Sequence, residues 1–166
     1  MNAEFFDASA LLSKEAYALD TQDWDGWLAL FIPNSEFWVP AWKSEHEPTS
    51  NPRRELSLIY YSSRGGLEDR VWRVRSGRSV ASKPMPRTQH AITNVMLAAV
   101  VDAGDALRVL SNFTVHQFRT KTRETEVLYG RYEHDLVREA GELKIRRKKI
   151  ILLNDYMPAM LDYYCL

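Results

Sequence analysis

Few side chains in this sequence are able to move a proton near neutral pH, and among them His90 has the most suggestive surroundings. It follows Arg87 by three positions in the run KPMPRTQHAITNV, which begins with prolines and continues with strand-forming residues. A histidine can act as a general base near neutral pH, and an arginine binds anions. Tyr17, Asp20 and His116 are further candidates, so the chemistry that these residue types offer is general acid–base catalysis.

The alternation of side chains along a β-strand argues against a joint site for Arg87 and His90. Neighbouring side chains of an extended strand point to opposite faces of the sheet. His90 then shares its face with Thr88, Ile92, Asn94 and Met96, and Arg87 shares the other face with Gln89, Ala91, Thr93 and Val95. Unless a β-bulge intervenes, we therefore expect two positional groups. Arg87 ties the start of the strand to a carboxylate or a backbone carbonyl, and His90 fills a polar slot in the sheet or in a subunit interface.

The sequence has no local motif for a metal, a nucleotide or a catalytic nucleophile. His46, His90, His116 and His134 are too far apart for a local metal motif, and the single cysteine, Cys165, excludes an intrachain disulfide and any thiolate-only iron–sulfur or zinc site. Neither a phosphate-binding glycine loop nor a G-x-S-x-G motif occurs. We interpret His46 as a solvated residue and His134 as a semi-buried histidine with a satisfied hydrogen bond. No catalytic, cofactor-binding or metal-binding residue is therefore assigned in this chain.

Length and charge exclude further classes of function. A chain of 166 residues is long enough for one domain with an ordinary hydrophobic core, so residues 1–166 are predicted to form a single domain. The 22 basic residues balance the 22 acidic ones, which leaves no net field to recruit nucleic acid or an anionic membrane. The first residues, MNAEFFDASALLSKEAYALD, lack the basic start of a signal peptide, and no apolar run is long enough to span a bilayer. We expect a cytoplasmic protein without nucleic-acid or membrane partners.

Sequence periodicity predicts helices in the first half of the chain and long strands in the second. Apolar residues at helical spacing predict a first helix from Asp7 or Ser9, a second over 24–31 and a third, around Leu67 and Val71, that Gly77 ends. The runs SEFWVPAWKS and LSLIYY are predicted to be strands on either side of a polar loop. Four long strands with short hairpin connections then follow, over Arg87–Val101, Ala106–Thr120, Glu124–Arg138 and Glu142–Asn154.

One face of these long strands is expected to meet a hydrophobic core. In the run from Ala106, apolar side chains alternate with polar ones: Leu107, Val109, Phe113 and Val115 on one face, and Arg108, Asn112, Thr114 and His116 on the other. Helices first and an antiparallel meander last predict the α+β class, with the helices packed on one side of a curved antiparallel sheet. We expect a cone-shaped half barrel.

The basic run and the aromatic residues both bear on the partners of the chain, and the aromatic residues indicate a protein partner. The basic run KIRRKK places charge on both faces of a strand, and Glu124, Glu126, Glu133 and Asp135 precede it on the neighbouring strand, so solvated or interface ion pairs are expected rather than a phosphate site. Five Trp and eight Tyr exceed what the core of one small domain easily buries. Trp and Tyr are favoured at protein interfaces because they combine an apolar body with a polar tip.

An acid–base enzyme is the alternative to a partner-binding protein. In this alternative Asp20, His90 and His116, with Tyr17 nearby, meet inside the concave face of the cone. Small cone-shaped enzymes similar to ketosteroid isomerase or scytalone dehydratase work in that way, and the helical pattern EAYALDTQDWDGWLALF is compatible with them. Such an enzyme would be active as a purified homo-oligomer, whereas a third class, a pure binding module, would bind an aromatic acid unaided.

Two stretches of the sequence resemble the small, or beta, subunit of Rieske-type aromatic-ring-hydroxylating dioxygenases, in particular the benzoate and anthranilate branch. They are LSLIYYSSRGGLEDRVWRVRSGRSVASKPMPRTQHAITNV and YGRYEHDLVREAGELKIRRKKIILLND. The most specific motifs within them are P-R-T-x-H-x-I-x-N and L-E-D-R-V-x-R. Together with LDTQDWDGWLALF, the resemblance covers most of the chain.

The resemblance implies a cone-like α+β fold of the nuclear-transport-factor-2 (cystatin-like) type and a mostly structural role. In such enzymes the alpha subunit carries the Rieske [2Fe–2S] cluster and the mononuclear Fe(II), and a separate reductase supplies electrons from NADH. Molecular oxygen is added across an aromatic ring to give a cis-diol. The resemblance further implies assembly with the alpha subunit, usually as three alpha and three beta chains, and a beta chain that is inactive alone.

Overall fold

The computed structural model describes residues 3–79, 82–98, 106–156 and 161–166. The helices of these residues are α1 (Ala3–Asp20), α2 (Trp24–Leu28), α3 (Arg64–Arg75) and the short 3-10 helix η2 (Tyr163–Cys165). The strands are β1 (Phe31–Pro40), β2 (Ser57–Tyr61), β3 (Arg87–Ala98), β4 (Leu107–Arg119), β5 (Glu124–Glu139) and β6 (Glu142–Leu152). The predicted order of helices and strands is confirmed.

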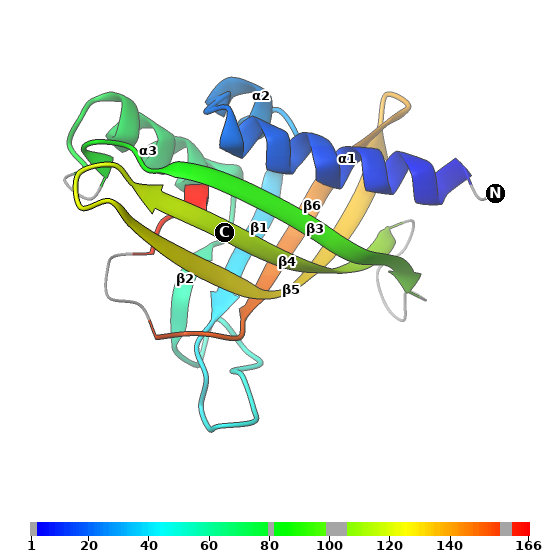
Figure 1. The fold of residues 1–166 in the computed structure, drawn as a ribbon. Helices are drawn as coiled ribbons and strands as arrows, with labels where there is room; N and C mark the ends of the chain where they lie inside the picture. Colours follow the sequence, from blue (N-terminus) through cyan, green and yellow to red (C-terminus); the bar gives the residue numbers. More distant parts are fainter. Residues whose placement is uncertain (1–2, 80–81, 99–105, 157–160) are drawn as a thin grey trace.

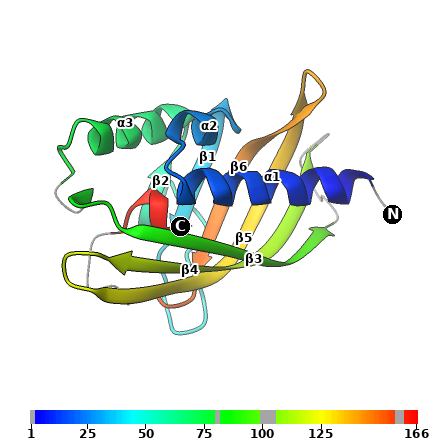
Figure 2. The same ribbon diagram turned by 45° about the horizontal axis from the view of Figure 1, so that its top comes forward.

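All six strands form one curved sheet in the order β2-β1-β6-β5-β4-β3, and the helices lie on one of its faces (Figure 1). α1 lies along the concave side and packs against β3, while α2 and α3 lie near each other at one end (Figure 2). We call the face toward α1 the inner face and the opposite one the outer face. The sheet therefore wraps one long helix, as expected for a cone-shaped half barrel.

Two of the predicted helix boundaries are wrong. α1 begins at Ala3 rather than at Asp7 or Ser9, and Glu4 in its first turn interacts favourably with the helix dipole. α2 ends at Leu28, and Phe31 opens a strand instead of closing the helix. The third helix is confirmed, because α3 buries Leu67 and Val71.

The four-strand meander is also confirmed, with β3 paired to β4, β4 to β5 and β5 to β6 in antiparallel register. Residues 99–101, the last part of the predicted strand Arg87–Val101, lie outside the described residues. The expectation of a purely antiparallel sheet needs a correction, because β1 pairs with β6 in parallel. Such a pair joins segments far apart in the chain, so local sequence patterns do not reveal it.

A β-bulge in β3 changes which side chains share a face. The register between β3 and β4 shifts between Thr93 and Met96, and Asn94 has a positive φ of 52°. Before the bulge, His90 lies on the inner face, where it contacts Asp20 of α1. Beyond it, Val95 packs against the core, and Met96 lies exposed on the outer face. The prediction that Met96 and Asn94 share the face of His90 is therefore wrong, because one extra residue inverts the alternation.

The core lies between the inner face of the sheet and the helices. The predicted alternation of β4 is confirmed, since Val109, Phe113 and Val115 are buried and His116 is exposed. The largest side chains buried in it are aromatic: Trp27, Tyr132, Tyr163, Phe31, Phe37 and Phe113. Trp38 is buried on the outer face instead, beneath Arg147 and Lys149. Much of the aromatic excess that the sequence assigns to an interface therefore lies in this core.

Candidate functional site

Two of the predicted acid–base residues, Asp20 and His90, are in direct contact. Asp20 is the last residue of α1, and His90 lies on the inner face of β3, which packs against that helix. Asp20 Oδ1 lies 2.6 Å from His90 Nδ1, and Asp20 Oδ2 accepts the His90 backbone N–H at 2.9 Å. The Thr88 hydroxyl donates to Asp20 Oδ1 at 3.0 Å. One carboxylate thus joins the end of α1 to the start of β3.

The pair has the chemical form of a histidine oriented by a carboxylate. Burial raises the pKa of Asp20, but hydrogen bonds from His90 and Thr88 outweigh burial and place this pKa below its ordinary value of 3.8. An ionised Asp20 accepts the Nδ1–H of His90, which leaves Nε2 as the free ring nitrogen. The His90 side chain is only 1% exposed, and its Nε2 has no hydrogen-bond partner among the residues that the structure describes. A substrate therefore has no open path to this nitrogen.

The structure does not bring the other predicted acid–base residues to this pair. His116 lies on the outer face, opposite Gln89 in the register, and Tyr17 points to solvent with 72% of its surface exposed. Of the set Asp20, His90 and His116 that the acid–base alternative requires, only Asp20 and His90 therefore meet. His116 lies on the outer face because side chains alternate between the two faces along β4.

The prediction for Arg87 is half right. Its side chain is exposed and does not share a site with His90, as expected. Among the described residues the expected carboxylate or carbonyl partner is not found, and the guanidinium lies over the ring of Phe118, 6.0 Å from its centroid. Phe118 is directly opposite Arg87 in the β3–β4 register, so a cation–π contact replaces the ion pair.

A second polar cluster, which the sequence analysis missed, lies deeper in the cone. Glu15 Oε1 accepts the Lys148 ammonium at 2.8 Å, and Glu15 Oε2 lies 3.2 Å from His134 Nε2. The side chains of all three are no more than 3% exposed. His134 is therefore fully buried rather than semi-buried. The overlooked signal was Glu15 itself, a carboxylate on the apolar stripe of α1, four residues after Leu11.

Burial and pairing act against each other in this cluster. Burial raises the pKa of Glu15, but the charge of Lys148 and the hydrogen bonds from His134 and Lys148 outweigh it and lower the pKa to about 2. Burial also lowers the pKa of His134 below 6.5, so its ring is neutral at neutral pH. The Lys148 ammonium further lies 4.3 Å from the centroid of the Tyr132 ring. The cluster is a structural ion pair between α1 and β6.

The last described residues close the inside of the cone. Tyr163, Tyr164, Cys165 and Leu166 are all at most 3% exposed. Tyr163 stacks on Trp27 with 4.9 Å between the ring centroids, and the Leu166 backbone oxygen accepts the Lys148 ammonium at 3.3 Å. Burial raises the pKa of the Cys165 thiol to about 12, so this cysteine is no thiolate nucleophile at neutral pH. The charged groups inside the cone, Asp20, Glu15 and Lys148, are thus all paired within the chain itself.

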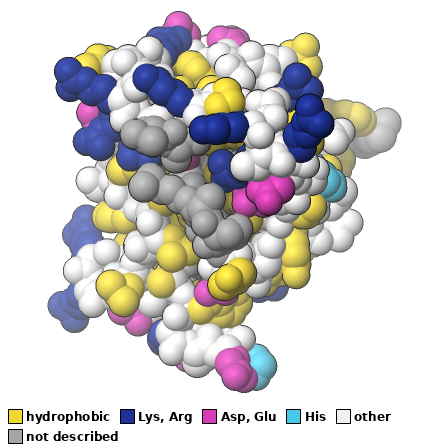
Figure 3. All heavy atoms as spheres, turned by 60° about the vertical axis from the view of Figure 1, so that its left-hand side comes forward, with side chains coloured by type: hydrophobic (Ala, Val, Ile, Leu, Met, Phe, Trp, Pro, Cys, Tyr) yellow, Lys and Arg dark blue, Asp and Glu magenta, His cyan; other side chains and the backbone are white. Residues whose placement is uncertain are grey.

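Basic side chains at the α3 end of the molecule are largely neutralised. Dark blue Lys and Arg side chains spread over the upper part of the face that Figure 3 shows. In α3, Arg73 pairs with Asp69 at 3.2 Å and Arg75 with Asp25 at 2.8 Å.

The ion pairs expected for KIRRKK are confirmed on the outer face. Lys149 pairs with Glu133 at 3.4 Å, and Arg147 lies 3.8 Å from Asp135. Glu126 pairs instead with Arg119 of β4, because β5 has a partner strand on each side.

The described residues form neither a metal-binding cluster nor a membrane-spanning helix. No group of three or more His, Cys, Asp or Glu side chains in this part of the chain is arranged to hold a metal ion. None of the described helices has the length and apolarity that crossing a membrane requires.

Known proteins similar to this chain are small subunits of ring-hydroxylating enzymes. The 2-halobenzoate 1,2-dioxygenase small subunit of Burkholderia cepacia is 35% identical over 164 residues, which cover 99% of this chain and 97% of the relative. The benzoate 1,2-dioxygenase beta subunit of Acinetobacter baylyi is 36% identical over 94% of this chain and 90% of its own length.

Structure and family comparisons agree with these relatives. The crystal structure of the benzoate 1,2-dioxygenase beta subunit from Burkholderia mallei matches with a TM-score of 0.78 and 33% identity, covering 96% of this chain and 95% of the other. The match confirms the predicted α+β cone fold. The model of the family described as ring hydroxylating beta subunit matches residues 14–159. The resemblance seen in the sequence is thereby confirmed, and the chain belongs to the family of ring-hydroxylating beta subunits.

Proposed function

We propose that this chain is the non-catalytic small subunit of a multicomponent dioxygenase that cis-dihydroxylates an aromatic carboxylate of the benzoate or anthranilate kind. The observation that carries the proposal is the similarity to a halobenzoate dioxygenase small subunit along nearly the whole chain. The inside of the cone supports it, because His90 and the Glu15 cluster are buried and used for internal contacts. The role of the chain is then to hold an assembly together, and its 166 residues act as one domain.

The proposal places the redox chemistry in a larger alpha subunit. That subunit would hold the Rieske [2Fe–2S] cluster and the mononuclear Fe(II), and a separate reductase would bring electrons from NADH to it. Three alpha and three beta chains would assemble in the cytoplasm. The substrate ring would contact the alpha subunit, and this chain would have no catalytic, cofactor-binding or metal-binding residue.

Co-expression with the alpha subunit from the same source tests the assembly. We expect one species much heavier than either chain, because a permanent subunit interface buries at least about 2,000 Å². Multi-angle light scattering after size-exclusion chromatography measures the mass. Two chains that elute separately at micromolar concentration would contradict the proposal.

Replacing His90 by alanine should lower the stability of the chain but leave the turnover of the assembled enzyme nearly unchanged. The variant leaves the half-buried Asp20 without its histidine, and loss of a buried hydrogen-bond partner costs about 1–3 kcal/mol. We therefore expect a lower melting temperature or a lower yield of complex, with turnover per iron within a few-fold of the parent. Thermal unfolding and substrate-dependent oxygen uptake measure the two quantities.

His46→Ala is the matched control, because His46 lies in an exposed loop and should change neither quantity. The stand-alone acid–base alternative predicts the opposite for His90. A His90→Ala variant that assembles normally but loses activity by about 100-fold or more would identify a general acid or base.

A further inference from the structure

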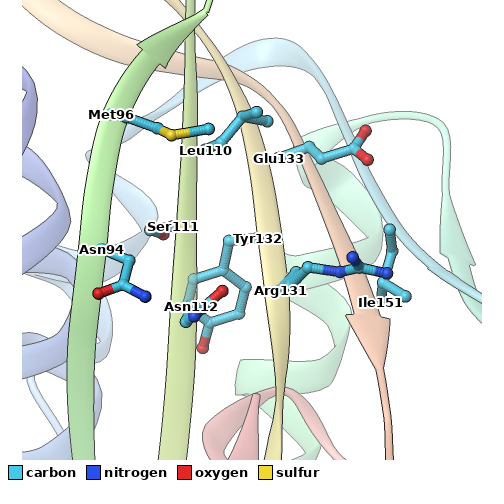
Figure 4. A pocket seen from close by; sticks show the side chains of 9 residues that line it. All are labelled: Asn94, Met96, Leu110, Ser111, Asn112, Arg131, Tyr132, Glu133 and Ile151. Atoms are coloured by element: carbon cyan, nitrogen blue, oxygen red, sulfur yellow. The ribbon is translucent and has the colours of Figure 1, made fainter.

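The outer face of the sheet has a hollow that the proposed function leaves unexplained. It lies across β3, β4, β5 and β6 and encloses about 460 Å³. Met96, Leu110 and Ile151 supply its apolar lining, and Asn94 and Asn112 stand beside one another along one side (Figure 4). Figure 4 also shows the Arg131 side chain extending toward Ile151. The hollow thus combines an apolar lining with amide groups, the Arg131 guanidinium and the carboxylate of Glu133, which is paired with Lys149.

The β-bulge at Asn94 shapes this hollow. The bulge adds one residue to β3 opposite β4, and Asn tolerates the positive φ better than most residues with a side chain. As a result, Met96 lies on the outer face directly opposite Leu110, with 54% of its surface exposed. Without the extra residue, the alternation would have pointed Met96 into the core. The backbone therefore presents an apolar side chain to the outside at this point.

Among the described residues of the outer face, Arg108, Arg147 and Lys149 are each paired with a carboxylate, whereas Arg131 is not. Arg108 pairs with Asp135 at 2.8 Å, Arg147 with Glu36 at 2.8 Å and Lys149 with Glu133 at 3.4 Å. Arg131 lies on the same face, between Asn112 and Ile151 in the register, and is exposed. Within the part of the chain that the structure describes, it meets no carboxylate. The face therefore lacks one negative charge, which a partner can supply.

Exposed apolar side chains extend the hollow into a larger patch. Tyr129 and Leu153 are joined by a hydrogen bond between their backbones, and they are 46% and 43% exposed. Tyr129 precedes Arg131 by two residues in β5, so both side chains lie on the outer face. An apolar centre with charged groups around it is the usual composition of a protein interface.

We propose that the outer face around this hollow is the docking surface for the alpha subunit. The alpha subunit would insert an apolar side chain beside Met96 and Leu110 and place a carboxylate against Arg131. This inference rests on the proposed function, which supplies the partner. A second copy of this chain packed face to face fits less well, because its outer-face carboxylates Glu36, Glu133 and Asp135 are already paired and two Arg131 side chains would approach each other.

Two variants with matched controls test the surface by co-expression with the alpha subunit. Arg131→Glu repels the expected carboxylate, and Met96→Asp places a charge in the apolar contact. Each should weaken assembly by about tenfold or more. Lys121→Glu, in the exposed turn between β4 and β5, and Phe6→Asp, at a position 49% exposed in α1, should stay within about twofold of the parent. Light scattering over a dilution series measures the dissociation.

Oxidation of Met96 in the parent protein gives a readout that needs no variant. Dilute peroxide converts an exposed methionine to its sulfoxide, and mass spectrometry of peptides follows the rate. We expect Met96 to react about tenfold more slowly in the complex than in the chain alone, since docking covers it. An unchanged rate in a complex of full size would overturn the docking surface.

The outcomes separate this inference from the proposed function. If the parent chain does not bind the alpha subunit at all, the proposed function fails. If the parent assembles and both variants assemble equally well, only the docking surface is wrong. If the variants instead lower the mass of this chain alone, a second copy occupies the face and the inference is overturned.

Discussion

Replacing Lys148 by methionine is expected to lower the free energy of unfolding by about 3–5 kcal/mol, because it removes one member of a buried ion pair. Lys148 and Glu15 are both at most 3% exposed at the side chain, and 2.8 Å separates their charged atoms. Without the ammonium, the polar partners that the Glu15 carboxylate keeps among the described residues are His134 and Trp27. Chemical denaturation followed by circular dichroism measures the change.

Two further variants make this result specific. Lys43→Met removes an exposed ammonium that pairs with Glu47 and should change stability little. A Glu15→Gln/Lys148→Met double variant removes both charges, so it should recover a large part of the loss. If Lys148→Met were as stable as Lys43→Met, the buried pair would not be what joins α1 to β6.

The pH dependence of stability provides a second readout of the same pair. The pKa of Glu15 is about 2 in the folded chain and 4.5 when unperturbed. A carboxylate with a lowered pKa stabilises the fold above pH 4.5, and this contribution is lost as the pH falls from 4.5 toward 2. In Lys148→Met the pKa of Glu15 should rise, so the acid-induced loss attributable to Glu15 should shrink.

Replacing Tyr163 by alanine should cost about 3–5 kcal/mol of stability, as expected for removing a large buried ring. Tyr163 is 1% exposed, stacks on Trp27 and meets the edge of Trp24 at 5.3 Å between centroids. The variant opens a cavity where the last described residues close the cone. Thermal and urea unfolding measure the loss.

Tyr163→Phe separates the contribution of the ring to stability from that of the hydroxyl. The Tyr163 hydroxyl is buried and has no hydrogen-bond partner in the described part of the chain, so Tyr163→Phe should be as stable as the parent or slightly more so. Tyr156→Ala, at a position 87% exposed, is the control for removing a tyrosine from the surface. If Tyr163→Ala behaved like Tyr156→Ala, the segment 161–166 would not be needed to close the cone.

The elements that the sequence predicts well are those with strong local periodicity. The meander from β3 to β6 follows from alternating side chains and short turns. The end of α3 follows from Gly77, whose φ of 69° suits a glycine. The parallel pairing of β1 with β6 and the bulge at Asn94 were not predicted, because the first depends on distant contacts and the second on a single inserted residue.

The contacts between polar groups inside the cone are also long-range, so the local sequence does not predict them. Asp20 and His90 were singled out by residue type, but only the fold reveals that they touch, at positions 70 residues apart. Lys148 is one of several basic residues in KIRRKK, and the sequence alone does not show which of them points to the inner face. His116 was placed correctly on the polar face of its strand, yet the acid–base alternative needed it on the other.

Iron content and oxygen uptake of this chain purified alone test the central claim, that the chain is a structural and not a catalytic subunit. We predict substoichiometric iron after dialysis against a chelator and no oxygen uptake with benzoate, anthranilate or a halobenzoate. The described residues offer no cluster of three or more His, Cys, Asp or Glu side chains that could hold a metal. About one iron per chain surviving the chelator, or oxidation of any of these acids by the chain alone, would contradict the account.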